Sequence, residues 1–126
     1  MPALAWVGRE PIEADRSYVV MSSRLPLRRF RSIAGFLRDT QAIRQQLDAV
    51  EGLVGYSLYA DLVHRTFWTF SVWADQGHLD AFAASDPHRR IIARLKPLMG
   101  QTRFATSTMT GSNIPSDWGE RKAPVS

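Results

Sequence analysis

The stretch Thr66-Phe67-Trp68-Thr69-Phe70-Ser71-Val72-Trp73-Ala74 is the most informative part of this chain for its fold. Its aromatic and β-branched composition is typical of a strand. Because side chains alternate along a strand, Phe67 and Trp73 face one side. The other side carries Trp68, Phe70 and Val72. A strand with large apolar groups on both faces is covered on both. We expect helices to supply one cover and a second subunit to supply the other.

Three further strands are predicted around this one. Residues 53–61 are rich in strand formers, and the polar link 62–65 makes them a hairpin with the stretch above. Residues 17–25 read as a first strand that ends at Pro26, and residues 103–109 as a last strand.

Helical spacing of apolar residues predicts the remaining elements. A long helix is expected between Ser32 and Val50, with Ser32 as N-cap and Gly52 as terminator. A short helix capped by Asp75 follows the hairpin, and Asp86-Pro87 is typical of the start of another. The resulting order, βαββαβ, predicts an α+β ferredoxin-like domain with a four-stranded antiparallel sheet and helices on one face.

The predicted domain spans residues 17–110. Residues 1–16 form an N-terminal arm of uncertain order, and residues 111–126 form a C-terminal tail that we expect to be irregular. Trp118 in this tail is expected to anchor it, either on the body of the domain or on a partner.

Composition narrows the function classes. The chain has 126 residues, 44% of them hydrophobic and 22% charged, which fits a single packed domain. It has no cysteine, which excludes disulfides and thiolate chemistry. Without a basic leader or a membrane-length apolar run, we expect a soluble, cytoplasmic protein with no membrane partner. The net charge of +4 could attract nucleic acid, but the stretch 66–74 has no Lys or Arg, so no nucleic-acid partner is expected.

Several motifs resemble one known superfamily. They are residues 51–58 (Glu-Gly-Leu-Val-Gly-Tyr-Ser-Leu), residues 67–75, Leu79-Asp80-Ala81-Phe82 and Ser85-Asp86-Pro87-His88. Together they look like the dimeric α/β-barrel superfamily, and within it the antibiotic-biosynthesis-monooxygenase-like proteins. The resemblance covers about residues 17–109. It implies a homodimer whose sheets pack face to face, and a pocket between each sheet and its helices.

The resemblance also implies several possible activities. Members carry out cofactor-free oxygenation of phenols, haem binding and degradation, isomerisation or cyclisation. The haem-degrading branch uses an asparagine, a tryptophan and a histidine, and the matching positions here hold Ser23, Trp73 and a residue near Ile92. Two of the three features are missing, so we expect no haem and no other cofactor.

Six residues are candidates for the pocket. Trp73, Ser23 and Phe36 are expected to bind substrate, Trp73 by stacking on a flat ring. Tyr56 is expected to donate a hydrogen bond, Arg24 to pair with an anion, and His88 to act as a general base. Ordinary core packing, salt pairing and solvent exposure are the alternatives for these residues. The histidines show no metal-ligand spacing, so no metal site is expected.

These features favour a cofactor-independent monooxygenase that acts on a small aromatic or polyketide-like compound. An isomerase or cyclase of the same fold, or a protein that only binds a small ligand, is the alternative. The sequence leaves open which compound is bound and whether the protein is catalytic.

Overall fold

A computed structural model describes residues 3–126, so Met1 and Pro2 of the predicted arm lie outside the described residues. The strands form one antiparallel sheet in the order β1-β3-β4-β2-β5. They are β1 (Val7–Gly8), β2 (Ser17–Pro26), β3 (Leu53–Asp61), β4 (Thr66–Trp73) and β5 (Arg103–Thr110). The helices are α1 (Ile33–Leu47), α2 (Gln76–Ala83), α3 (His88–Leu95) and α4 (Trp118–Lys122). Short 3-10 turns occupy Phe30–Ser32 (η1), Lys96–Leu98 (η2), Gly111–Asn113 (η3) and Ala123–Val125 (η4).

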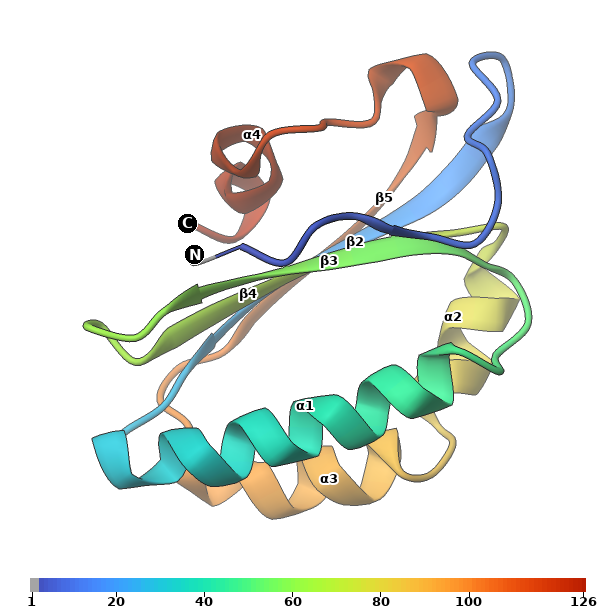
Figure 1. The fold of residues 1–126 in the computed structure, drawn as a ribbon. Helices are drawn as coiled ribbons and strands as arrows, with labels where there is room; N and C mark the ends of the chain where they lie inside the picture. The colour runs from blue at the N-terminus through green and yellow to red at the C-terminus, as the bar shows by residue number, and fades with distance from the viewer. Residues whose placement is uncertain (1–2) are drawn as a thin grey trace.

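Other elements of the chain pack against both faces of the sheet. Helices α1, α2 and α3 lie on one side of it and α4 lies on the other, while the N-terminal arm runs along the β3 edge (Figure 1). We call the first side the inner face and the second the outer face. The α+β ferredoxin-like fold is thereby confirmed. Two details differ from the expectation: the arm adds the short fifth strand β1 at the sheet edge, and the helices are not confined to one face.

Side-chain capping is present at the start of α2 and absent at the starts of α1 and α3. The Asp75 side chain accepts a hydrogen bond from the His78 backbone N–H at 2.9 Å, so it caps α2 as expected. Ser32 occupies the N-cap position of α1 without a side-chain capping bond. Helix α3 begins at His88, one residue later than Asp86-Pro87 predicted, with Pro87 at the N-cap position and the Asp86 carboxylate paired with Arg89.

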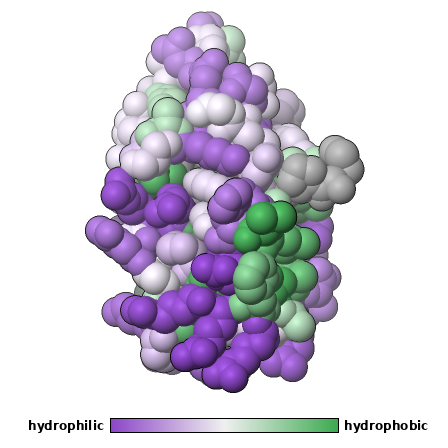
Figure 2. Space-filling model, turned by 90° about the vertical axis from the view of Figure 1, so that its left-hand side faces the viewer, coloured by the Kyte–Doolittle hydropathy of each residue, from purple (hydrophilic) through white to green (hydrophobic). Residues whose placement is uncertain are grey.

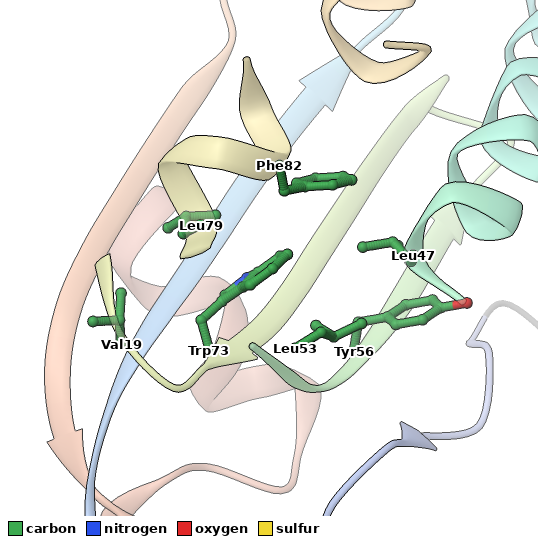
Figure 3. Packing of buried hydrophobic residues seen from close by; sticks show 7 residues of the cluster. All are labelled: Val19, Leu47, Leu53, Tyr56, Trp73, Leu79 and Phe82. Atoms are coloured by element: carbon green, nitrogen blue, oxygen red, sulfur yellow. The ribbon is translucent and has the colours of Figure 1, made fainter. Parts of the chain in front are cut away.

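The inner face carries two clusters of buried apolar side chains. One cluster joins the sheet to α2 and the end of α1. Figure 3 shows the rings of Trp73 and Phe82 close together in this cluster, with Leu47 on the α1 side. The other cluster joins the hairpin end of the sheet to α1 and α3 and is centred on Phe36 and Phe67. The sheet therefore contacts α1 at the two ends of that helix, through Phe36 and Leu47.

The outer face is covered by the chain itself. Tyr18, Val20, Val54, Phe70 and Val72 form a buried cluster on this face, and all five are 3% exposed or less. Four apolar side chains pack against it, from the arm, from β5 and from the tail: Trp6, Met109, Ile114 and Trp118. The sequence correctly required a second cover, but in this structure the tail and the arm provide it where we expected a second subunit.

The tail is ordered, which corrects the expectation of an irregular segment. Trp118 begins α4 and packs on the body of the domain, with its ring centroid 5.6 Å from that of Tyr59. The Arg121 guanidinium lies 4.8 Å from the centre of the Phe70 ring and 5.4 Å from that of Trp6. Cations above aromatic faces attract the ring quadrupole, so these contacts hold the tail on the sheet.

Across residues 3–126, none of the helices has the length and apolar character needed to cross a membrane.

Candidate functional site: a cavity under the inner face of the sheet

A cavity of about 380 Å³ lies between the inner face and the helices. Its size falls in the range of sites that bind small organic molecules. Strands β2, β3 and β4 supply its floor, and α1 and α3 supply most of the opposite wall. Most lining side chains are apolar or aromatic, so the cavity suits a largely apolar ligand.

Two aromatic pairs mark opposite ends of the cavity. Near α2, the ring centroids of Trp73 and Phe82 are 5.3 Å apart with an interplanar angle of 32°. Near the hairpin, Phe36 and Phe67 are stacked at 4.3 Å with an angle of 14°. All four residues line the cavity. Their flat faces can hold a planar ring by stacking.

His88 lines the cavity at the start of α3. Its Nδ1 lies 3.0 Å from the Ala83 carbonyl oxygen, and its ring centroid lies 4.7 Å from that of Phe82. A carbonyl can only accept, so Nδ1 carries the hydrogen and Nε2 of the neutral ring keeps a free lone pair. Burial lowers the pKa of His88 from its usual value, and the carbonyl hydrogen bond opposes this only in part. The ring is therefore mostly neutral near pH 7 and can accept a proton at Nε2.

Tyr56 and Arg44 form a polar pair at the cavity wall. The Arg44 Nε donates a hydrogen bond of 3.0 Å to the Tyr56 hydroxyl oxygen, and both residues line the cavity. Because the tyrosine oxygen accepts this bond, its own hydrogen is free to be donated to a ligand.

Hydroxyl groups interrupt the apolar floor at three positions. The Ser23 and Thr69 hydroxyls, on β2 and β4, form a short hydrogen bond with each other. The Ser71 hydroxyl oxygen accepts a bond of 2.9 Å from the Trp73 indole N–H. Ser23, Thr69 and Ser71 all line the cavity.

One carboxylate also belongs to the lining. Asp39 on α1 is only 7% exposed, and its Oδ1 accepts a short hydrogen bond from Arg94 on α3. This pair ties α1 to α3 beside the cavity. Within residues 3–126, no three side chains of the kinds that commonly bind metals lie close enough together to hold an ion.

Five of the six predicted site residues lie together. Trp73, Ser23, Phe36, Tyr56 and His88 all line the cavity.

Arg24 does not lie with them, which corrects its expected contact with substrate. It sits on β2 between Ser23 and Leu25, which both line the cavity, so its own side chain projects from the outer face. Arg44 is the arginine that lines the cavity.

Sequence reasoning missed Arg44, Asp39, Thr69 and Ser71 as lining residues. Thr69 and Ser71 could have been found from the sequence. They lie on the same face of β4 as Trp73, because side chains alternate along a strand, and they are polar residues in an apolar stretch. The two on α1 had no such signal, since charged residues on a helix are mostly solvent-exposed.

The cavity reaches the surface beside α1 and β5. Leu37 and Phe104 line it and are 47% and 60% exposed. Figure 2 shows an apolar patch on the end of the molecule that carries the hairpin and the start of α1. Phe30, Leu37, Leu62 and Val63 are the exposed apolar side chains of those elements. Apolar surface at this end favours the approach of an apolar ligand.

Solved structures with the same fold come from several organisms. A conserved protein from Methanosarcina mazei Go1 is 17% identical, with a TM-score of 0.64, over 71% of this chain and 90% of that one. A dimeric ferredoxin-like protein of unknown function from Thermobifida fusca is 13% identical, with a TM-score of 0.64, over 80% of this chain and 99% of that one. A candidate monooxygenase from Fusobacterium nucleatum is 14% identical, with a TM-score of 0.68, over 80% of this chain. This chain spans only 46% of that longer one. At these identities the likeness concerns the fold.

The search of curated proteins gave no match. A family model for antibiotic biosynthesis monooxygenase does match, over residues 32–94, which is 63 of the 126 residues. The matched region contains α1, the β3–β4 hairpin, α2 and most of α3, and therefore most of the cavity wall. The chain belongs to the antibiotic biosynthesis monooxygenase family.

Proposed function

We propose that this protein is a cofactor-independent monooxygenase that oxidises a small planar aromatic or polyketide-like compound. The observation that carries the proposal is a mostly apolar cavity with aromatic walls that contains one histidine held neutral, with Nε2 free. Family membership supports the reaction class. A site of this kind can bind a flat substrate, remove a proton from it and keep water away.

The chemistry needs only molecular oxygen and an acidic ring system. A base removes a proton from the substrate, and the resulting carbanion or phenolate passes one electron to O₂. The two radicals combine into a peroxide at the ring carbon, which accepts a proton. Loss of water, with removal of the second hydrogen from that carbon, gives the carbonyl of a quinone. For anthrone the balance is C₁₄H₁₀O + O₂ → C₁₄H₈O₂ + H₂O.

Four residues share the work in this proposal. The His88 Nε2 accepts the substrate proton and later returns it to the peroxide. The Tyr56 hydroxyl donates to the oxygen on which negative charge develops, and Arg44, bonded to that hydroxyl, further stabilises the charge. Trp73 stacks on the ring and limits its orientation.

Oxygen uptake by metal-depleted protein with anthrone tests the proposal. We expect uptake above the spontaneous rate, with anthraquinone as product by mass spectrometry. His88→Gln should lower the turnover rate about 100-fold or more, since it removes the base. His64→Gln is the matched control, because His64 lies in the exposed hairpin turn, where its side chain pairs with Asp61 and does not line the cavity.

Two results would contradict the proposal: no uptake by folded protein across a panel of anthrones and naphthols, or a His88→Gln variant as active as the wild type. A product with the mass of its substrate would instead identify the isomerase or cyclase alternative.

We also propose that the protein is a homodimer. Support comes from the Thermobifida fusca protein of the same fold, which is described as dimeric. Light scattering with size-exclusion chromatography measures the mass directly, and a monomer at micromolar concentration would overturn this part.

A further inference from the structure

We infer that the hydroxyl groups of Ser23, Thr69 and Ser71 form a recognition stripe that binds oxygen atoms of the ligand. The stripe crosses a floor that is otherwise apolar. The inference rests on the proposed function in one respect only, that the cavity binds a small aromatic compound, and it adds which part of that compound the floor selects.

The Ser71 hydroxyl has a hydrogen that remains available to a ligand. The Ser71 oxygen accepts the Trp73 indole N–H, and that indole is a donor only. The hydrogen of Ser71 is therefore not used in this bond. Among residues 3–126 no acceptor for it is found, and Ser71 lines the cavity while being only 8% exposed.

The hydroxyl pair of Ser23 and Thr69 also has one hydrogen available to a ligand. Two hydroxyls that bond each other use one hydrogen and leave the other. Within the part of the chain that the structure describes, that second hydrogen has no other acceptor. The stripe thus offers a ligand two hydrogen-bond donors on a mostly apolar floor, where Ser23 and Ser71 are only 2% and 8% exposed.

Strand geometry fixes how these donors are arranged. Thr69 and Ser71 are two residues apart on β4 and face the same side, so they are separated by about 7 Å. Ser23 lies directly opposite Thr69 on β2, and Tyr56 lies directly opposite Ser71 on β3. The donors follow a short path across the floor, with the Trp73 ring beside it.

Energetics favours a ligand with oxygen at these points. A donor buried without a partner is costly, so an apolar ligand lying on the stripe would leave two hydroxyl hydrogens without an acceptor. A ligand with carbonyl, phenol or phenolate oxygens satisfies them. The cavity should therefore discriminate among rings of equal size by their number of oxygen atoms.

Naphthalene, 1-naphthol and 1,4-naphthoquinone test this with one ring skeleton and zero, one or two oxygens. Equilibrium dialysis measures their binding to the full chain, which has no cysteine to react with the quinone. We expect the wild type to bind the quinone most tightly and naphthalene most weakly. Each hydrogen bond should change the dissociation constant by about two- to tenfold.

The variants remove donors in two ways. Ser71→Ala removes one donor, and Ser23→Ala with Thr69→Val removes a bonded pair together, so that neither partner is left alone. Each should weaken quinone binding about fivefold and leave naphthalene binding within about twofold. Ser22→Ala is the matched control, since Ser22 is a buried serine of β2 on the outer face.

Conservative variants guard against a folding defect, because Ser71→Ala also takes the acceptor from the Trp73 indole. Ser71→Thr and Thr69→Ser retain the hydroxyl and should retain quinone affinity.

The inference is overturned if the variants weaken all three ligands equally, if quinone binding does not change, or if the wild type binds none of the three. Oxygen uptake in the same variants separates the two proposals. Stripe-dependent binding without any uptake refutes the monooxygenase proposal alone, and uptake without stripe-dependent binding refutes the stripe alone.

Discussion

The two faces of strand β4 carry similar side chains and have different covers. On the inner face, Trp73 and Phe67 meet helices that stand far enough from the sheet to leave a cavity of about 380 Å³. On the outer face, Phe70 and Val72 meet the chain's own tail and arm, which pack directly against them.

The difference shows that hydrophobicity of a strand does not by itself locate a ligand site. Both faces bury aromatic groups, and one tryptophan of β4 faces each side. The two faces of β4 differ in the elements that pack against them. On the inner face the helices leave a cavity between themselves and the sheet, whereas on the outer face a short segment rich in aromatic and cationic groups packs directly on the strands. Four predictions test this contrast, starting with the largest expected effect.

Replacing the two tryptophans of β4 should have unequal effects. Trp73 is 1% exposed, so Trp73→Ala should lower the free energy of unfolding by about 3–5 kcal/mol. Trp68 is only partly buried, and Trp68→Ala should cost less than half as much. Urea denaturation measures both, and equal losses would show that the two faces are equally packed.

Removing residues 111–126 should destabilise the domain by roughly 2 kcal/mol. Val125 is 1% exposed, and Ile114 and Trp118 pack on the outer cluster, so their burial is lost. The chain entropy recovered by the freed tail offsets part of this.

The truncated protein should also expose Phe70 and Val72 and associate with itself, which light scattering can detect. A truncated protein as stable and as monodisperse as the full chain would mean that the tail contributes nothing to the outer face.

Arg121→Ala should lower the free energy of unfolding by about 1–2 kcal/mol. The Arg121 side chain is buried, its guanidinium lies over Phe70, Trp6 and Trp118, and its Nε donates to the Pro115 carbonyl oxygen at 3.1 Å. Thermal unfolding measures the loss. Arg103→Ala is the control, because that arginine is exposed and, within residues 3–126, its side chain donates to the Ser126 carbonyl oxygen alone. Equal shifts in the two variants would argue against an anchoring role.

His88 should make the stability of the inner face depend on pH. Burial lowers its pKa in the folded state below the value of about 6.5 expected in the unfolded chain. Between these two pKa values the unfolded chain binds more protons, so stability rises with pH in this window.

The contribution of His88 is therefore complete above pH 6.5 and is lost as the pH falls below it. His88→Gln should remove this part of the slope, measured as the free energy of unfolding between pH 5 and 7.5. An unchanged slope would show that the histidine is not held neutral by burial.

Much of the fold was predictable because local patterns and tertiary contacts agree. The strands over residues 17–26, 53–61, 66–73 and 103–110 lie within one or two residues of their predicted bounds. The Asp75 cap was predictable for the same reason, since it requires only neighbours in sequence. Residues 3–16 and the tail were not, because their structure depends on contacts with distant strands and not on a local period.

The candidate site was predictable in its strand residues and less so in its helix residues. The family resemblance proposed Ser23 and Trp73 for the pocket, and the chemistry of its hydroxyl proposed Tyr56; all three line the cavity. Strand alternation explains why Arg24, next to Ser23, points away from it. Arg44 could not be predicted from α1 alone, because its place beside Tyr56 depends on how far the helix stands from the sheet.

By itself the sequence determined the ferredoxin-like order of elements and the demand for cover on both faces of β4, because these follow from periodicity and from the cost of exposing apolar groups. Only the tertiary structure decided which cover fits closely and which leaves a cavity. That outcome depends on the distance between the sheet and the elements opposite, which no local pattern encodes. In the structure the cavity lies beside the Trp73 ring, whereas the Trp68 ring contacts Tyr59 and the tail residue Lys122.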